Sequence, residues 1–161
     1  MAQVIKVGMA DLNVCKAPDA ITTLGLGSCV GVCLYDAPLK IAGMVHVMLP
    51  DSTIIKDNSN TAKFADTGIT LLLEKLLAMG CNKSRLTAKI AGGAQMFAFG
   101  TNNDMLRVGD KNVAAVKNML ARLNIPVIAQ DTGDSFGRTI VFYPENGSLK
   151  ITAIGKFEKF I

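Results

Sequence analysis

The sequence lacks any long apolar run. Its longest stretch without a charged residue extends from Ala20 to Tyr35 and includes threonines, a serine and three glycines. That stretch is too short and too polar to cross the ~30 Å hydrocarbon core of a bilayer. The N-terminal residues also lack the basic region, apolar run and small-residue cleavage site of a secretory signal. We therefore expect a cytoplasmic protein that does not insert into membranes.

Cysteine pairs and histidines are equally scarce. The four cysteines, at positions 15, 29, 33 and 81, form no CxxC pair, and His46 is the only histidine. A reducing compartment keeps thiols free, so structural disulfides are not expected. No zinc-finger spacing can be assembled from these residues, and the missing CxxC weakens a thiol redox role. We expect no metal and no cofactor.

A basic stripe interleaved with aromatic residues is absent as well. The 17 basic and 13 acidic residues are scattered along the chain, which argues against nucleic-acid binding. The 161 residues contain no repeat, low-complexity tract or Pro/Ser-rich linker. Because a domain typically has about 150 residues, we expect one domain over residues 1–161.

Short apolar runs bounded by Gly, Asp or Pro predict strands, whereas two segments have helical spacing. The first helical segment contains Phe64 to Met79, after a possible cap at Asn60 or Thr61, and ends at Gly80. The second contains Val113 to Leu123, after Asp110 or Asn112. The strands come in runs separated by single helices, which predicts an α+β fold with antiparallel or mixed sheets and the two helices on the outer faces. The predicted strands are Val4–Val7, Ile21–Leu26, Val30–Tyr35, Ile41–Leu49, Leu86–Ile90, Val127–Gln130, Thr139–Tyr143 and Leu149–Ile154.

The segment Thr23-Leu-Gly-Leu-Gly-Ser-Cys29 predicts a nucleophile turn. Its glycines allow positive φ and bring Cys29 to the beginning of a strand, where the sulfur can face a cleft. Backbone amides around Gly27, Ser28 and Cys29 are candidate donors to the oxygen of a substrate carbonyl. Cys33 lies on the same face of that strand but inside it, where burial leaves a thiol inert. We therefore expect Cys29 to be the nucleophile.

His46 is the one side chain whose ordinary pKa is near neutral, so any Cys–His mechanism must use it. Its strand, Ile41 to Leu49, is apolar throughout. A structural core histidine with one ring nitrogen bonded to a backbone carbonyl is therefore the alternative.

Together, TLGLGSCVGVCLYD and the following GMVHVMLP resemble the CheD family of chemoreceptor glutamine deamidases. The resemblance continues through the segments 63–67, 92–97, 108–112 and 131–138 and covers nearly the whole chain. It implies that Cys29 is the nucleophile, His46 the base and Thr23 the residue that completes the site. It also implies an enzyme without a cofactor that converts receptor glutamines to glutamates through a thioester.

The resemblance implies two partners: the cytoplasmic domain of methyl-accepting chemotaxis receptors as substrate, and a CheC-type phosphatase. The apolar cluster Met96, Phe97 and Phe99 is a candidate contact patch, with core packing as the alternative. Two positions depart from the family pattern, which usually has arginine where Lys111 stands and glycine where Asp134 stands. Two other functions remain open, a cysteine amidase with another substrate and a non-catalytic chemotaxis adaptor.

Overall fold

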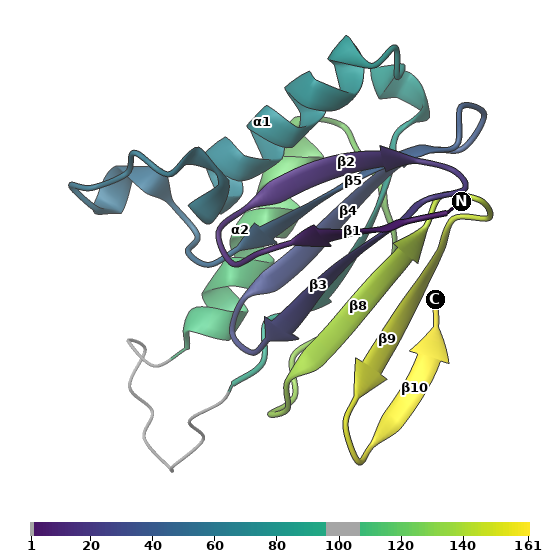
Figure 1. Cartoon of the computed structure of the whole chain (residues 1–161). Helices are drawn as coiled ribbons and strands as arrows, with labels where there is room; N and C mark the ends of the chain where they lie inside the picture. The colour runs from purple at the N-terminus through teal and green to yellow at the C-terminus, as the bar shows by residue number, and fades with distance from the viewer. Residues whose placement is uncertain (1, 96–106) are drawn as a thin grey trace.

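Within residues 2–95 and 107–161, ten strands form two five-stranded sheets, and two α-helices lie against one of them (Figure 1). The computed structural model describes residues 2–95 and 107–161. The first sheet has the order β1-β3-β8-β9-β10 and the second β2-β5-β4-β6-β7. The strands are β1 (Val4–Val7), β2 (Leu12–Lys16), β3 (Ala20–Leu26), β4 (Val30–Asp36), β5 (Ile41–Val47), β6 (Thr87–Gly92), β7 (Val127–Thr132), β8 (Arg138–Tyr143), β9 (Ser148–Ala153) and β10 (Phe157–Phe160). The helices are α1 (Ala65–Ala78) and α2 (Val108–Arg122), with three short 3-10 turns at Ser52–Ile54, Thr61–Lys63 and Lys83–Arg85.

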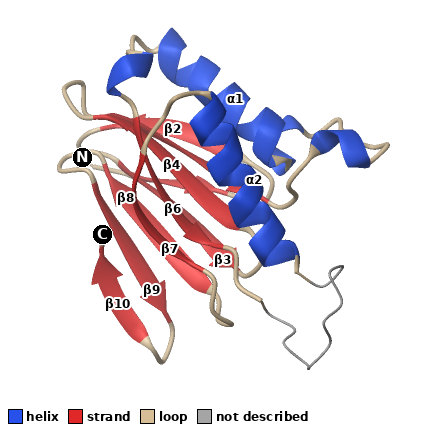
Figure 2. Ribbon diagram, turned by 180° about the vertical axis from the view of Figure 1, so that it is seen from behind, coloured by secondary structure: helices blue, strands red, loops and turns tan. Residues whose placement is uncertain are grey.

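The layers are sheet, sheet and helices, with a hydrophobic core in each of the two gaps. Both α-helices cover the outer face of the second sheet, as Figure 2 shows from behind. The side chains of alternate β4 residues, Val30, Val32 and Leu34, belong to the core under the helices. The intervening Cys29 and Cys33 face the core between the sheets. This alternation explains why β4 is apolar from Val30 to Leu34: it is buried on both faces.

The predicted α+β class with mixed sheets is confirmed. Two strands were missed, β2 and β10, and each lies at the edge of its sheet. The reason is their burial: an edge strand with one solvated face, such as Phe157–Phe160, carries too few apolar residues to stand out in the sequence. Cys15 therefore lies in a strand and not in a loop.

The first helix ends where predicted, immediately before Gly80, which has φ +98°. Its predicted caps were wrong, because Asn60 precedes a separate 3-10 turn and the N-cap of α1 is Phe64. The predicted caps of α2 were also wrong. The helix begins at Val108, so Asn112 lies inside it and its side chain bonds elsewhere.

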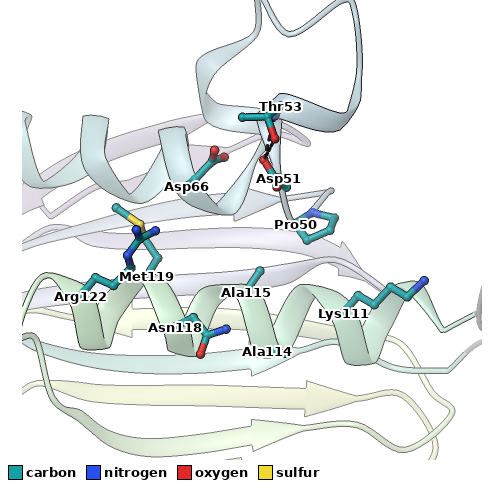
Figure 3. Close-up of a pocket in the computed structure, with 10 residues that line it drawn as sticks. All are labelled: Pro50, Asp51, Thr53, Asp66, Lys111, Ala114, Ala115, Asn118, Met119 and Arg122. Carbon is teal, nitrogen blue, oxygen red and sulfur yellow. Dashed lines mark hydrogen bonds between the residues drawn. The ribbon is translucent and has the colours of Figure 1, made fainter.

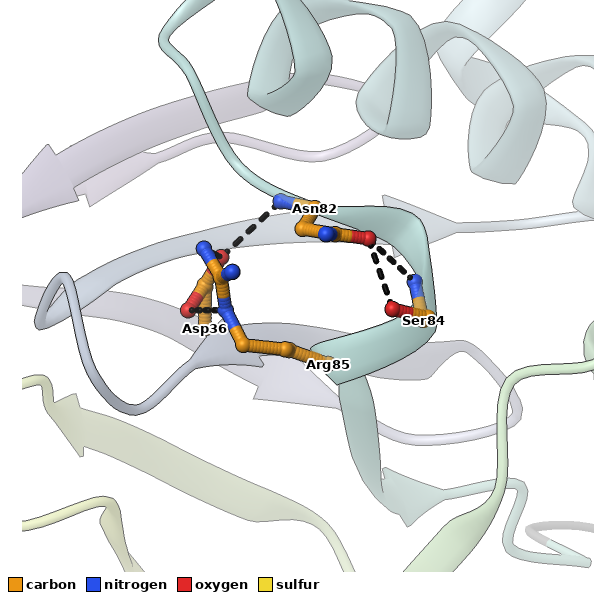
Figure 4. A network of polar contacts seen from close by, with 4 residues as sticks. All are labelled: Asp36, Asn82, Ser84 and Arg85. Carbon is orange, nitrogen blue, oxygen red and sulfur yellow. Dashed lines mark hydrogen bonds and ion pairs between the residues drawn. The ribbon is translucent and has the colours of Figure 1, made fainter.

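An ion pair fixes the end of β4 that is remote from Cys29 (Figure 4). Asp36 is fully buried, and it accepts hydrogen bonds from Nε and Nη2 of Arg85 at 3.0 and 2.9 Å. The backbone amide of Asn82 donates to the same carboxylate at 3.0 Å. Burial alone would raise the pKa of Asp36, but these donors and the positive charge lower it below its usual range.

Candidate functional site

Cys29 lies between a bulged strand and the first residue of β4. In β3 the pairing with β8 shifts register between Thr23 and Leu26, so Leu24 and Gly25 bulge outward and are exposed. Gly25 has φ +70°, the conformation expected from the glycine-rich sequence. After the bulge the chain crosses from the first sheet to the second within a few residues. Cys29 thus stands at the start of a strand, as predicted.

The backbone of Cys29 is held by the end of β6. The amide of Gly93 donates to the Cys29 carbonyl at 2.8 Å, and the amide of Ala94 donates to the Gly27 carbonyl at 2.9 Å. Gly92 has φ +112°, and a Cβ there would collide with the Cys29 carbonyl oxygen. Only glycine permits this close approach, so the GG dipeptide fixes the backbone at Cys29.

Strand register brings Cys29 and His46 onto one face of the second sheet. Antiparallel pairing of β4 with β5 sets Gly31 opposite His46 and Val30 opposite Val47. Cys29 precedes Gly31 by two residues, so it shares its face and is the diagonal neighbour of His46. Diagonal neighbours have Cα atoms about 7–8 Å apart, within reach of long side chains. Gly31 has no side chain to stand between them.

Thr23 meets His46 from the opposite sheet and determines its tautomer. The Thr23 hydroxyl lies 2.7 Å from the Val7 carbonyl oxygen and 2.7 Å from Nδ1 of His46. A carbonyl can only accept, so the single hydroxyl proton is donated to Val7. The hydroxyl must then accept from the imidazole, which places the imidazole proton on Nδ1. The other nitrogen, Nε2, is buried and has no partner among the described residues.

Both reactive groups are neutral at pH 7. Burial raises the pKa of the Cys29 thiol, although its own backbone N–H partly opposes the effect. Burial lowers the pKa of His46, which is fully enclosed. The pair is therefore a thiol facing an unprotonated base and not a preformed thiolate–imidazolium ion pair. Such a base is ready to accept a proton when the thiol reacts.

The three candidate oxyanion donors differ in availability. The amide of Gly27 donates to the Gly25 carbonyl at 3.1 Å, so it is not free to bind an oxyanion. Within residues 2–95 and 107–161, the amides of Ser28 and Cys29 form no backbone hydrogen bond. Ser28 therefore stays a candidate, and Cys29 is the second amide beside it.

The remaining thiols are poor nucleophiles. All four cysteines are free and buried. Burial and the charge of Asp19 raise the pKa of Cys15 to about 12. Burial also raises the pKa of Cys33 and of Cys81. Cys15 shares the inter-sheet face with His46 but lies opposite Ala42, four residues before His46 along β5. Cys81 belongs to the other core, under the helices.

A hollow of about 580 Å³ lies beside α2, outside the Cys–His pair (Figure 3). One wall is the exposed face of α2 from Lys111 to Arg122, and the other contains Asp51 and Asp66. It contains neither a nucleophile nor a histidine, so it is not the chemical site. In the described part of the chain, no group of three or more His, Cys, Asp or Glu side chains is placed to hold a metal ion. None of the helices described there combines the length and apolar character needed to cross a bilayer.

Sequence reasoning missed two residues that hold the site. Asn112 donates from its side chain to the carbonyls of Ser28 and Met48, each at 3.0 Å. Arg138 is buried and donates to Asp131 at 2.9 Å and to the Gly133 carbonyl at 3.0 Å. Both residues belong to segments that carried the family resemblance, but no local pattern indicates which backbone atoms they bind.

A family model described as CheD chemotactic sensory transduction matches residues 48–153. A probable chemoreceptor glutamine deamidase CheD of Lachnoclostridium phytofermentans is 65% identical over 161 residues, which is 100% of both chains. The chain belongs to the CheD family. The chemoreceptor glutamine deamidase CheD of Halalkalibacterium halodurans is 56% identical over 162 residues, 100% of each chain. That of Bacillus subtilis is 50% identical over 161 residues, 99% of this chain and 97% of the relative.

The two departures from the usual CheD pattern lie away from the Cys–His pair. Lys111 is exposed and lines the hollow beside α2. Asp134 has φ +58°, the conformation for which the family's glycine is suited, and its carbonyl accepts from the Gln95 amide at 2.8 Å. The predicted contact cluster Met96, Phe97 and Phe99 lies outside the described residues.

Proposed function

We propose that this CheD-family chain is a chemoreceptor glutamine deamidase that hydrolyses glutamine side-chain amides to glutamates, with Cys29 as nucleophile and His46 as base. The support is twofold. Relatives at 50% and 65% identity over almost the full length are named chemoreceptor glutamine deamidases. The second support is geometric: the Thr23 hydroxyl lies within hydrogen-bond distance of His46, and Cys29 immediately precedes β4, in which Gly31 pairs with His46.

The hydrogen-bonding state of His46 carries this proposal. A structural histidine in a core has its polar atoms satisfied. Here only Nδ1 is satisfied, through Thr23, while Nε2 is buried and unpartnered among the described residues. An unprotonated Nε2 on the face that Cys29 shares is what a general base requires. The alternative of a purely structural His46 leaves that nitrogen without a function.

In the first half of the reaction, Nε2 of His46 takes the proton of the Cys29 thiol as the sulfur attacks the amide carbon of the substrate glutamine. The carbonyl electrons move to the oxygen, which the amides of Ser28 and Cys29 are placed to stabilise. The carbon–nitrogen bond then breaks, and the imidazolium returns its proton to the departing nitrogen. Ammonia leaves, and a thioester remains on Cys29.

In the second half, water attacks the thioester carbon while His46 again accepts a proton. The carbon–sulfur bond breaks, the imidazolium protonates the sulfur, and a glutamate is released. Thr23 keeps Nδ1–H engaged throughout, so Nε2 alone exchanges protons. It also accepts the hydrogen bond that stabilises the transient imidazolium. The cycle requires no cofactor or metal.

The finer assignments follow from the same resemblance. The substrate is the cytoplasmic domain of a methyl-accepting chemotaxis receptor, and the chain acts in the cytoplasm. A CheC-type phosphatase is the second partner, and it competes with the receptor for an overlapping surface. Adding the phosphatase to a receptor deamidation assay should therefore slow the reaction. An unchanged rate at saturating phosphatase would show that the two surfaces are separate.

The deciding experiment is mass spectrometry of receptor cytoplasmic fragments after incubation with the protein, because conversion of Gln to Glu adds about 1 Da per site. Cys29→Ala and His46→Ala should each abolish the gain, and Cys33→Ala serves as the matched control on the same strand. Retained ammonia release in either of the first two variants, with a normal circular dichroism spectrum, would remove the Cys–His mechanism.

The same assay separates the two other functions. A cysteine amidase with another substrate would release ammonia from free glutamine or short amides and leave receptor fragments unchanged. A non-catalytic adaptor would keep signalling intact in cells that carry Cys29→Ala.

A further inference from the structure

Asn112 joins the two strands of the Cys–His pair at the point where their own pairing ends. The β4–β5 ladder runs to Val30 and Val47 and does not continue. The next segments carry Cys29 on one side and Met48 on the other. Asn112 is fully buried, and its one side-chain amide group donates to the carbonyl of Ser28 and to that of Met48, each at 3.0 Å.

Both hydrogens of the Asn112 side-chain amide are used in these two hydrogen bonds. A carboxamide nitrogen carries two hydrogens, and each reaches a different carbonyl. One carbonyl belongs to the residue before the nucleophile, and the other to a residue two positions after the base. The donor comes from α2, which packs on the other face of the sheet. The amide thus replaces, from outside the sheet, the ladder bonds that β4 and β5 no longer make with each other.

Helix α2 packs closely against the end of β6, so the position of Asn112 relative to the sheet is fixed. Gly109, one turn before Asn112, is so close to the carbonyls of Gly93 and Ala94 that any Cβ would collide with them. Those two residues also donate the backbone bonds that hold Cys29 and Gly27. Helix α2, the end of β6 and the nucleophile turn therefore form one connected frame.

We propose that Asn112 is a positioning residue for the reaction: its side-chain amide fixes the separation of Cys29 from His46 by holding the Ser28 and Met48 carbonyls together. This inference rests on the proposed Cys–His mechanism. Asn112 does not touch the reacting atoms. It acts on them through two backbone carbonyls, so its loss displaces the nucleophile relative to the base without removing either.

The test uses Asn112→Leu, which keeps the approximate size of the side chain and removes both donors. Asn118→Leu, an exposed asparagine on the same helix, is the matched control. Misplacement by about 1 Å costs on the order of 100-fold in rate, so kcat of Asn112→Leu should fall roughly 10- to 100-fold. The KM for the receptor fragment should stay within about twofold, since docking is untouched, and Asn118→Leu should retain the kcat of the parent.

A second readout separates positioning from general loss of structure. The rate of Cys29 alkylation by iodoacetamide is measured against pH in the parent, Asn112→Leu and His46→Ala. The profile of Asn112→Leu should approach that of His46→Ala, because the thiol has lost its base. A parent-like profile together with a parent-like kcat would overturn the proposal. If Asn112→Leu does not fold, Asn112→Ser decides by the same criteria, since a single hydroxyl can hold only one of the two carbonyls.

Failure of this inference is distinguishable from failure of the proposed function. If Cys29→Ala is inactive while both Asn112 variants deamidate the receptor fragment at the parent rate, the proposed mechanism stands and the positioning role of Asn112 is wrong. If Cys29→Ala retains full activity, the mechanism is wrong, and the positioning role falls with it.

Discussion

Thr23→Val tests the hydrogen bonding of His46 directly. Valine has nearly the shape of threonine but cannot donate or accept, so the substitution removes both contacts of the hydroxyl. It removes the hydrogen bonds that the Val7 carbonyl and Nδ1–H of His46 make to this hydroxyl, in a site where Thr23 is 1% exposed and His46 is 0% exposed. The perturbation is therefore confined to two buried hydrogen bonds.

The size of the effect follows from that count. Each buried group deprived of its partner costs about 1–3 kcal/mol, so the free energy of unfolding should fall by about 2–6 kcal/mol for Thr23→Val. In the enzyme that still folds, the imidazole loses its orientation and its fixed tautomer. We expect kcat to fall roughly 10- to 100-fold, less than the complete loss expected for Cys29→Ala or His46→Ala.

The control is Thr23→Ser, which keeps the hydroxyl and deletes one methyl group. It should retain most of the deamidation rate and lose about 1 kcal/mol of stability. Urea unfolding measures the stability, and mass spectrometry of a receptor fragment under saturating conditions measures the deamidation rate. A Thr23→Val enzyme with the parent kcat would show that Nε2 becomes a competent base without the hydroxyl, and the reasoning from the tautomer would be refuted.

Three other predictions address acid sensitivity, the remote ion pair and the glycine beside the nucleophile. Burial lowers the pKa of His46 in the folded protein below its ordinary value near 6.5, so the unfolded chain binds the proton first as the pH drops. The free energy of unfolding should therefore decrease from about pH 7.5 down through the folded pKa. Urea titrations should show this decrease in the parent and not in His46→Gln. Arg85→Met strands the buried carboxylate of Asp36 and should lower the urea midpoint more than the double variant with Asp36→Asn; equal midpoints would argue against the pair. Gly92→Ala should lose activity because its Cβ meets the nucleophile's carbonyl oxygen, whereas Gly155→Ala, also at positive φ but with nothing within 4 Å, should stay active.

The elements that could be predicted are those buried on at least one long face. The strands around Cys29 and His46 are apolar throughout because they are covered on both sides, by the other sheet and by the helices. Two edge strands, Leu12–Lys16 and Phe157–Phe160, were missed because polar residues follow their first apolar residue. The other two, Val4–Val7 and Val127–Thr132, begin with consecutive apolar residues and were predicted. The pattern of apolar residues also could not show that both helices lie on the same sheet, since an amphipathic helix needs a covered face but does not specify which sheet covers it.

Cys29 and His46 could be proposed from the sequence because they are scarce or follow glycines, whereas the residues that support them could not. One histidine and one cysteine after a GLGS turn leave few choices for a thiol mechanism. Asn112 was taken for a helix cap because asparagine commonly occupies that position. Its actual partners are backbone carbonyls 84 and 64 residues away. Every residue has a backbone carbonyl, so the sequence does not indicate which ones a side chain will bind. Contacts of this kind become visible only when the chain is folded.

The neutral state of the Cys–His pair has a consequence for when the enzyme reacts. A thiolate held beside an imidazolium would attack any electrophile that reached it, but burial here raises the pKa of Cys29 and lowers that of His46, so both charges are disfavoured before substrate arrives. Proton transfer from Cys29 to His46 becomes favourable only when the substrate carbonyl lies against the amides of Ser28 and Cys29. The negative charge then passes from the sulfur to the carbonyl oxygen, which these amides stabilise by hydrogen bonds. The same desolvation that suppresses the free thiolate thus ties its formation to a correctly seated amide. Under the proposed mechanism, selectivity for a glutamine amide depends on the position of these backbone donors and does not require an intrinsically reactive cysteine.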